Sequence, residues 1–264
     1  MPDRQQVSIR VPLAGGGELD GYLSYRGQSG PDAVLYVHGF GSTRGGTKSE
    51  ALERACERRG WTFASFDFRG HGRSAGSLLD LRGSALVEDL DAVADHLEQL
   101  GVRRLFPIGS SMGGWAASWF AVKRGNAAVP AVGLIAPAFR FLHQRWDALS
   151  PEQREEWQRT GRLRVRNQWV DVEIGYPVAE ELERFRPEAL AARWDAPLLI
   201  YHGMADDTVP AADSLAFVGR ASFPDIELRL LRGGDHRLLS YKDELADEFC
   251  RFFGRFWSGE NLLS

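Results

Sequence analysis

The segment "GSSMGG", residues 109–114, directly follows the apolar run "RRLFPI" (103–108). Glycines two positions before and two positions after Ser111 give the pattern G-x-S-x-G, which is typical of a nucleophile elbow. The two glycines leave room for a sharp turn from a strand into a helix, with the serine hydroxyl exposed at the turn. Ser110 fits less well, because larger residues would then stand at the two positions of close approach. The pattern predicts Ser111 as a nucleophile; a serine that merely caps an ordinary helix is the alternative.

Short apolar runs alternate with helical patterns on both sides of this motif. The runs are typical of strands in a parallel sheet that is covered on both faces, and they lie at 33–37, 62–67, 104–108, 131–137, 197–203 and 226–232. Between them, residues 48–59 and 84–100 carry apolar side chains at three- and four-residue spacing, so each should form a helix that buries one face. We therefore expect an α/β fold with a doubly wound, mostly parallel sheet. "VSIRV" (7–11) and "LDGYLSY" (19–25) should form an antiparallel pair at one edge.

One stretch interrupts this alternation, at about residues 139–192, where the chain becomes polar and is expected to be helical. Ser150 and Pro151 are typical of the first positions of a helix. We interpret the stretch as a cap inserted over the carboxyl edge of the sheet, within a single domain that spans residues 1–264. Tryptophans are concentrated in it, and they could either pack its underside or line an acyl pocket. The residues assigned to that pocket are Trp146, Trp157 and Trp169, together with Trp115 beside the elbow.

A serine nucleophile needs backbone donors for the oxyanion of its tetrahedral intermediate. One N–H comes from the residue after the nucleophile and the other from the loop after an earlier strand. The segment "YVHGFGS", residues 36–42, follows the predicted strand at 33–37 and supplies such a loop. Met112 and Phe40 occupy the two donor positions. This second motif favours the nucleophile elbow over a capping serine.

The general base should be a histidine, and the chain has six. His96 lies on a predicted helix and His143 in the insertion. His38, His71 and His202 precede glycines in turns and are expected to brace loops by hydrogen bonding. His236 remains: it follows the last predicted strand through two glycines, in a loop that can carry its imidazole to Ser111.

The acid that orients this histidine should come from a loop between Ser111 and His236 in the sequence. Serine hydrolases with a nucleophile elbow use the chain order serine, acid, histidine. The segment "HGMADDTVP" (202–210) offers Asp206 and Asp207 at the end of a predicted strand. Neighbouring side chains of an extended loop point to different sides, so only one of them can reach His236. The loop after the preceding strand, "IAPAFRF" (135–141), contains no carboxylate.

Together, "YVHGFGS", "FDFRGHGRS" (66–74), "GSSMGGW", "HGMADDTVP" and "GGDHR" resemble the α/β-hydrolase superfamily, from about residue 7 to the end of the chain. Three of them are similar to the small serine esterase, palmitoyl-thioesterase and acyl-glucuronide esterase group. The resemblance implies Ser111 as nucleophile, Asp206 as acid, His236 as base, and Phe40 and Met112 as oxyanion donors. It also implies that "FDFRGHGRS" shapes the fold, with Asp67 and Arg69 in structural roles.

Composition excludes several classes of partner. The formal net charge is −4 and the sequence pI is about 5.9, so the chain lacks the positive charge expected for binding nucleic acid or an anionic membrane. Its beginning is polar and no run of 18 apolar residues occurs, so we expect no signal peptide, no membrane span and a cytoplasmic location. Cys56 and Cys250 should be buried thiols. The histidines lack metal-ligand spacing, and no metal or other cofactor is predicted. The sequence does not predict an oligomeric state.

These residues predict a serine hydrolase that cleaves carboxylic esters or thioesters of small, largely apolar acyl substrates through an acyl-enzyme. Two other functions use the same scaffold. A C–C bond hydrolase employs the same triad and has the same motifs. A hydrolase-like receptor would keep the pocket without turnover, because fold alone does not decide function. Filled catalytic positions favour an enzyme.

Overall fold

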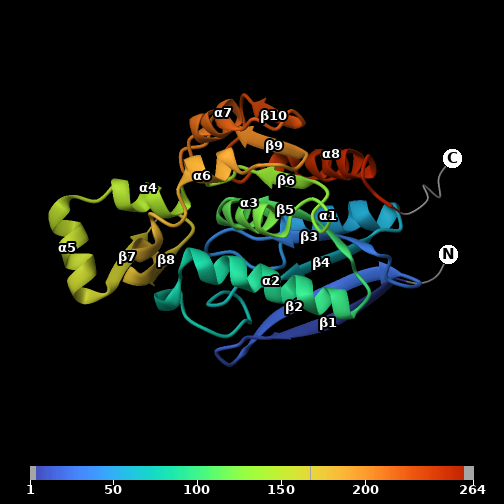
Figure 1. Ribbon diagram of the computed structural model, residues 1–264, viewed down its shortest axis with the longest axis horizontal. Helices are drawn as coiled ribbons and strands as arrows, with labels where there is room; N and C mark the ends of the chain where they lie inside the picture. The colour runs from blue at the N-terminus through green and yellow to red at the C-terminus, as the bar shows by residue number, and fades with distance from the viewer. Residues whose placement is uncertain (1–3, 167, 259–264) are drawn as a thin grey trace.

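The computed structural model describes residues 4–166 and 168–258, and Figure 1 shows a central sheet between layers of helices. Within the described residues this sheet has eight strands in the order β1-β2-β4-β3-β5-β6-β9-β10. Its strands are β1 (Arg4–Pro12), β2 (Glu18–Arg26), β3 (Asp32–Val37), β4 (Thr62–Phe66), β5 (Arg104–Ser110), β6 (Val132–Ile135), β9 (Leu198–Gly203) and β10 (Ile226–Leu231). From β4 to β10 neighbouring strands are parallel, whereas β1 and β2 form the predicted antiparallel edge pair.

The helices cover both faces of the sheet, as a doubly wound fold requires. On one face, α1 (Thr47–Arg58) and α8 (Lys242–Gly254) pack against buried residues of β3, β4, β5 and β9, and both cysteines lie there as buried, free thiols. On the other face lie α2 (Gly83–Gln99), α3 (Met112–Arg124) and α7 (Ala211–Arg220). Because β3, β5, β9 and β10 are parallel strands of one sheet, the loops that follow them lie at the same carboxyl edge. Sheets of this kind bind ligands at that edge.

The insertion is only partly helical, which corrects the sequence-based expectation. It contains α4 (Phe141–Asp147), α5 (Pro151–Thr160), the hairpin strands β7 (Arg162–Arg166) and β8 (Asp171–Gly175), the 3₁₀ helix η2 (Tyr176–Glu181) and α6 (Pro187–Ala192). The hairpin follows a two-residue alternation: Val165 and Ile174 are buried, whereas Arg164 and Asp171 form an ion pair on the outer face. Figure 1 shows α4, α5, β7 and β8 gathered at one end of the molecule.

The insertion shares its hydrophobic core with the sheet. Buried side chains of the hairpin and of α5 belong to the same cluster as those of α2 and α3. The capping residues expected for α5 are present, because the Ser150 hydroxyl accepts a hydrogen bond from the Gln153 N–H at 3.3 Å and Pro151 opens the helix. The single-domain organisation stays a prediction of the sequence, and this continuous packing supports it.

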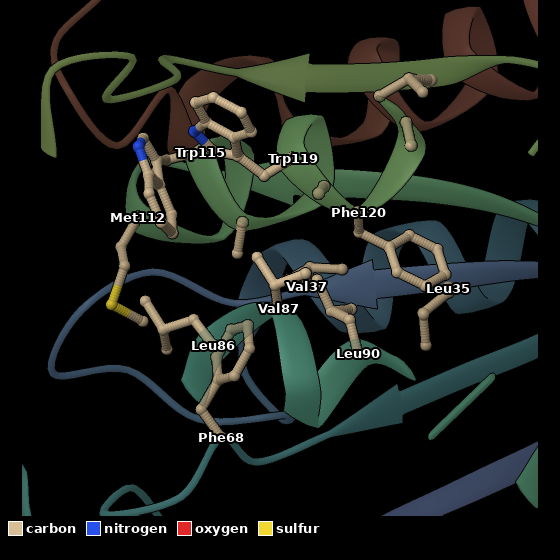
Figure 2. Close-up of a cluster of buried hydrophobic side chains, with 14 of the residues drawn as sticks. Leu35, Val37, Phe68, Leu86, Val87, Leu90, Met112, Trp115, Trp119 and Phe120 are labelled. Carbon is tan, nitrogen blue, oxygen red and sulfur yellow. The ribbon is translucent and has the colours of Figure 1, made fainter. Parts of the chain in front are cut away.

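The turn from β5 into α3 is a sterically crowded point of the fold. Ser111 has a φ of 54° and a ψ of −118°, a conformation that L-residues rarely adopt. A Cβ atom on Gly109 would lie 2.4 Å from the Gly113 carbonyl oxygen, and one on Gly113 would lie 2.2 Å from the Val37 carbonyl oxygen. The first turn of α3 is anchored on the other side: Figure 2 shows Met112 and Trp115 pointing toward the buried side chains around Leu86 and Phe68.

The variant Gly113→Ala should be strongly destabilised. Its methyl group would also lie 2.4 Å from the His38 carbonyl oxygen, and both obstacles are backbone atoms that cannot rotate away. We expect the free energy of unfolding to fall by about 1–3 kcal/mol or more, as for other overpacked sites. Denaturant unfolding measures this loss. Gly30→Ala is the matched control, because no atom of residues 4–166 and 168–258 lies within 4 Å of its added Cβ; equal stability of the two variants would contradict the crowding.

Candidate active site

The structure brings Ser111, His236 and Asp206 into one hydrogen-bonded chain. His236 Nε2 lies 3.0 Å from Ser111 Oγ, and His236 Nδ1 lies 2.7 Å from Asp206 Oδ2. The three side chains come from the turns after β5, β9 and β10, so the order of the sheet, rather than proximity in sequence, assembles them. A histidine that donates to a carboxylate through Nδ1 leaves Nε2 free to accept the serine proton. The arrangement is thus able to activate Ser111.

The backbone around Ser111 holds it in this position. Its N–H donates to the Ile135 carbonyl at 3.0 Å, and its carbonyl accepts hydrogen bonds from Gly114, Trp115 and Ala138 at 2.9–3.1 Å. The neighbouring Ser110 points elsewhere: its hydroxyl accepts a hydrogen bond from Lys48 Nζ at 2.7 Å. Of the two serines in the motif, Ser111 is the one that meets the histidine.

Asp206 and Asp207 occupy different environments, which separates the two candidates that the sequence leaves open. Asp206 Oδ1 accepts hydrogen bonds from the N–H groups of Thr208 and Val209 at 2.9 and 2.8 Å, while Oδ2 faces His236. Asp207 instead accepts a hydrogen bond from the Thr208 hydroxyl at 3.1 Å. The Asp206 side chain is therefore fixed by its own loop with one oxygen aimed at the imidazole.

A second histidine supports the same carboxylate. His202 Nε2 lies 3.2 Å from Asp206 Oδ2 and 3.0 Å from the Val209 carbonyl oxygen, so this nitrogen carries the proton. His202 Nδ1 then accepts from the Ser214 hydroxyl at 2.8 Å. Burial opposes the ionisation of Asp206, but hydrogen bonds from His202, His236 and the Val209 N–H outweigh it. They hold the pKa of the carboxyl group well below its usual range.

The other expected loop histidines also make bracing contacts. His38 is buried, donates from Nδ1 to the Gly39 carbonyl at 2.8 Å and accepts from the Phe68 N–H at Nε2, 3.0 Å away. Burial and the neighbouring His71 lower the pKa of His38 to about 3, so it stays neutral.

The segment "FDFRGHGRS" (66–74) makes structural contacts. The Asp67 carboxylate accepts hydrogen bonds from the backbone N–H groups of Arg44 and Arg73. Arg69 donates to Asp89 at 2.7 Å.

The two predicted oxyanion donors stand beside Ser111. The His38–Gly39 turn packs directly on the elbow, because a Cβ on Gly39 would lie 3.1 Å from the Ser110 carbonyl oxygen and 3.3 Å from Ser111 Cβ. Phe40 follows in this turn, and Met112 opens α3. Across the described ranges, neither the Phe40 N–H nor the Met112 N–H donates a hydrogen bond to the protein. Both groups are free to bind a developing oxyanion.

A cavity of about 590 Å³ opens over Ser111 and His236. Most of its apolar wall comes from the insertion and the loops beside it, in the side chains Phe40, Leu81, Phe141, Leu142, Val165, Val170, Ile174 and Val178. Trp169, in the turn of the hairpin, also lines it and lies roughly parallel to the His236 ring, with 5.8 Å between ring centroids. The size and lining suit a small ligand with an apolar part.

Three of the four tryptophans assigned to the pocket do not line this cavity, which corrects that assignment. Trp157 is buried and packs edge-on against Tyr176, with ring centroids 5.6 Å apart, and Trp146 lies beneath the Arg154 guanidinium at 4.8 Å. Trp115 packs edge-on against Phe185 in the core on the α3 side. These rings hold the insertion together, and short aliphatic side chains on the hairpin line the cavity in their place.

The family model described as serine aminopeptidase, S33, matches residues 31–170. The chain belongs to this family. The matched segment runs from the start of β3 through the elbow to the hairpin turn, and so includes the loops of Phe40 and Ser111. Within the described residues, no helix is both long and apolar enough to cross a bilayer.

Curated relatives of this family member are similar over most of its length. The mitochondrial palmitoyl-protein thioesterase ABHD10 of Mus musculus is 28% identical over 225 residues, which cover 84% of this chain and 74% of that protein. ABHD10 of Homo sapiens is 26% identical over the same share of this chain and 72% of its own length.

Solved structures confirm the predicted α/β-hydrolase fold. Mouse ABHD10 superposes with a TM-score of 0.79 at 25% identity, covering 95% of this chain and 98% of that one. Est1E from Butyrivibrio proteoclasticus, with ferulic acid bound, gives a TM-score of 0.78 at 21% identity over 92% and 98% of the two chains, and this likeness concerns the fold alone. The chain is an α/β-hydrolase.

In the variant Asp206→Asn, the free energy of unfolding should depend less on pH in the acidic range than it does in the wild type. The unfolded carboxyl group titrates near pKa ~3.9, and the folded group titrates well below its usual range. The ionised group therefore contributes stability that is fully present above about pH 5 and is lost as the pH falls through the folded pKa. Between about pH 5 and pH 3 the wild-type free energy of unfolding should change more steeply than that of the variant, by up to about 1.4 kcal/mol per pH unit.

Denaturant unfolding at several pH values measures these slopes. The matched control is Asp207→Asn, because among the described residues no histidine donates a hydrogen bond to Asp207, and its substitution should keep the wild-type slope. An unchanged slope in Asp206→Asn would mean that the hydrogen bonds from the two histidines do not hold the carboxylate as described.

Proposed function

We propose that this α/β-hydrolase cleaves carboxylic esters or thioesters of small, largely apolar acyl substrates through an acyl-enzyme on Ser111. The hydrogen-bonded chain from Ser111 through His236 to Asp206 carries the proposal, since it matches the geometry that serine hydrolases need. The apolar wall of the cavity supports the acyl specificity. The similarity to ABHD10, named as a palmitoyl-protein thioesterase, supports a thioester among the substrates.

The residues have distinct roles in the reaction. Ser111 Oγ attacks the substrate carbonyl while His236 Nε2 takes its proton, and the resulting oxyanion accepts hydrogen bonds from the N–H groups of Phe40 and Met112. The protonated His236 gives its proton to the departing alkoxide or thiolate, which leaves the acyl group on Ser111. His236 then deprotonates a water molecule that attacks this ester, and it returns the proton to Ser111 Oγ as the acid is released. Asp206 keeps the imidazole in the required tautomer and stabilises its charge.

Two other functions fit the scaffold, and turnover distinguishes them. A C–C bond hydrolase would use the same residues but would prefer a vinylogous diketone to an ester. A receptor would bind a ligand with no turnover that depends on Ser111. The cytoplasmic location also stays a prediction, whereas the relative ABHD10 is named as a mitochondrial protein.

The variant Ser111→Ala should lose nearly all activity. Removing the nucleophile should lower kcat for a p-nitrophenyl ester by a factor of about 10⁴ or more, because only the oxyanion donors and binding remain. A fluorophosphonate should label the wild type once, and peptide mass spectrometry should find the adduct on Ser111. An adduct on Ser110, or full activity in Ser111→Ala, would overturn the assignment.

The value of kcat/KM should rise with the length of the substrate's acyl chain until the apolar wall of the cavity is covered. Each buried methylene contributes about 0.8 kcal/mol, which is close to fourfold in kcat/KM. Across p-nitrophenyl esters from acetate to palmitate, kcat/KM should therefore rise and then fall. The variant Ile174→Phe should move the maximum to a shorter chain, because Ile174 lines the cavity on the hairpin. A maximum at acetate would exclude this wall as the acyl site; thermal unfolding of the variant checks that it remains folded.

A further inference from the structure

One end of the cavity is cationic, and the reaction described above makes no use of it. This cationic end consists of Lys48 and Arg237 with the side chains of Tyr36 and Ser110, all on the lining that also contains Ser111 and His236. Lys48 comes from the first turn of α1 and donates from Nζ to Ser110 Oγ at 2.7 Å. Arg237 directly follows His236 in the chain. The two positive charges therefore stand next to the residues that would carry out catalysis.

The charges of the cationic end are not neutralised by the protein. Within the described residues, no carboxylate lies within ion-pair distance of the Lys48 or Arg237 side chains. Burial, together with the positive charge of Arg237, lowers the pKa of Lys48 to about 8, and the more distant Asp235 and Asp206 oppose this only in part. Lys48 is half-buried and its hydrogen bond to Ser110 supplies no negative charge, so an anion bound beside this ammonium group would be favoured.

The balance of charge over the whole cavity points the same way. Among the described residues on its lining, four are cationic, Lys48, Arg145, Arg166 and Arg237, and one, Asp207, is anionic. The chain as a whole has a net charge of −4. The positive lining is therefore a local property of the cavity, and such a lining concentrates anionic ligands.

The cationic end and the apolar wall lie on opposite sides of the sheet. Tyr36 packs in the cluster beneath α1 and α8, and α1 also carries Lys48. Val165, Ile174 and Val178 belong to the cluster on the α2 and α3 side. Ser111, at the carboxyl edge of the sheet, stands where the two sides meet. A substrate held by both would have its scissile carbonyl between an apolar group and a charged group.

We propose, on the basis of the function above, that the preferred substrates are acyl esters or thioesters with an apolar group on one side of the scissile bond and a carboxylate on the other, bound by Lys48 and Arg237. Ammonium and guanidinium donors with two neighbouring hydroxyl groups suit a carboxylate. The phosphates of coenzyme A are separated from its thioester by the long pantetheine arm. They cannot occupy a site that adjoins the nucleophile.

Two pairs of substrates test the proposal and locate the carboxylate. In the first pair, 4-octanoyloxybenzoate carries it on the leaving group, and methyl 4-octanoyloxybenzoate is the neutral counterpart. In the second, mono-2-naphthyl glutarate carries it on the acyl group, and 2-naphthyl methyl glutarate is neutral. Each kcat/KM is divided by the rate of hydroxide-catalysed hydrolysis, which removes differences in intrinsic reactivity. In one of the pairs the wild type should prefer the anion by about tenfold or more.

Variants then assign the preference to the cationic end. Lys48→Met removes the charge at similar volume, and Arg237→Gln removes the second cation; each should lower the anion-to-neutral ratio about tenfold. Lys48→Arg should keep most of the ratio. Lys123→Met is the matched control, because Lys123 lies on the exposed side of α3, paired with Asp91, and its loss should leave both rates unchanged.

The outcomes separate this proposal from the function on which it rests. If the wild type hydrolyses none of the four compounds with dependence on Ser111, the proposed hydrolase function fails. If it hydrolyses the neutral esters as well as or better than both anions, or if the ratio is the same in Lys48→Met and wild type, the hydrolase function stands and the carboxylate site is rejected.

Discussion

The close approach of α3 to the end of β3 is the constraint on which the rest of the site depends. Only residues without a side chain fit at Gly109 and Gly113, where backbone carbonyl oxygens of the elbow and of β3 lie closer than any Cβ contact allows. This contact presses the helix onto the loop that contains Phe40. It also forces Ser111 into its unusual backbone conformation. The steric contact that strains one residue thus also places the turn before Phe40 directly against Ser111.

The Asp206 carboxylate is the negatively charged group around which the other polar groups of the site are arranged. Asp206 is shared by two histidines with different duties: His202 is fully buried and fixed by Ser214, while His236 is only partly buried and faces the cavity. The buried histidine and two backbone N–H groups stabilise the negative charge independently of His236. The histidine beside the cavity therefore faces Ser111 while its carboxylate partner is held in place by other groups.

Most of the fold and the hydrogen-bonded triad follow from local patterns, whereas the cavity wall does not. The strands and the elbow are encoded by unbroken apolar runs and glycine spacing. The bounds of β2, α1 and α2 lie within one residue of the predicted ones, whereas β1 begins three residues before its predicted start. The hairpin was missed because its alternation is short and its outer face is crowded with arginines. The tryptophans of the insertion are a different case, since composition cannot tell an aromatic ring that packs from one that binds. Nothing in the sequence marks Lys48 as a cavity residue, because it belongs to an ordinary amphipathic helix some sixty residues before the elbow.

The two sides of the cavity are formed by different parts of the chain. The apolar wall is built mainly from an insertion between β6 and β9, which can lengthen, shorten or be replaced without breaking a strand of the main sheet. The cationic end is built into β3, α1 and the loop after β10, where changes would disturb the core. Under the proposed function, preference for acyl length can therefore change rapidly during divergence while preference for charge is retained. Selectivity is thereby modular, with one module free to evolve and the other tied to folding.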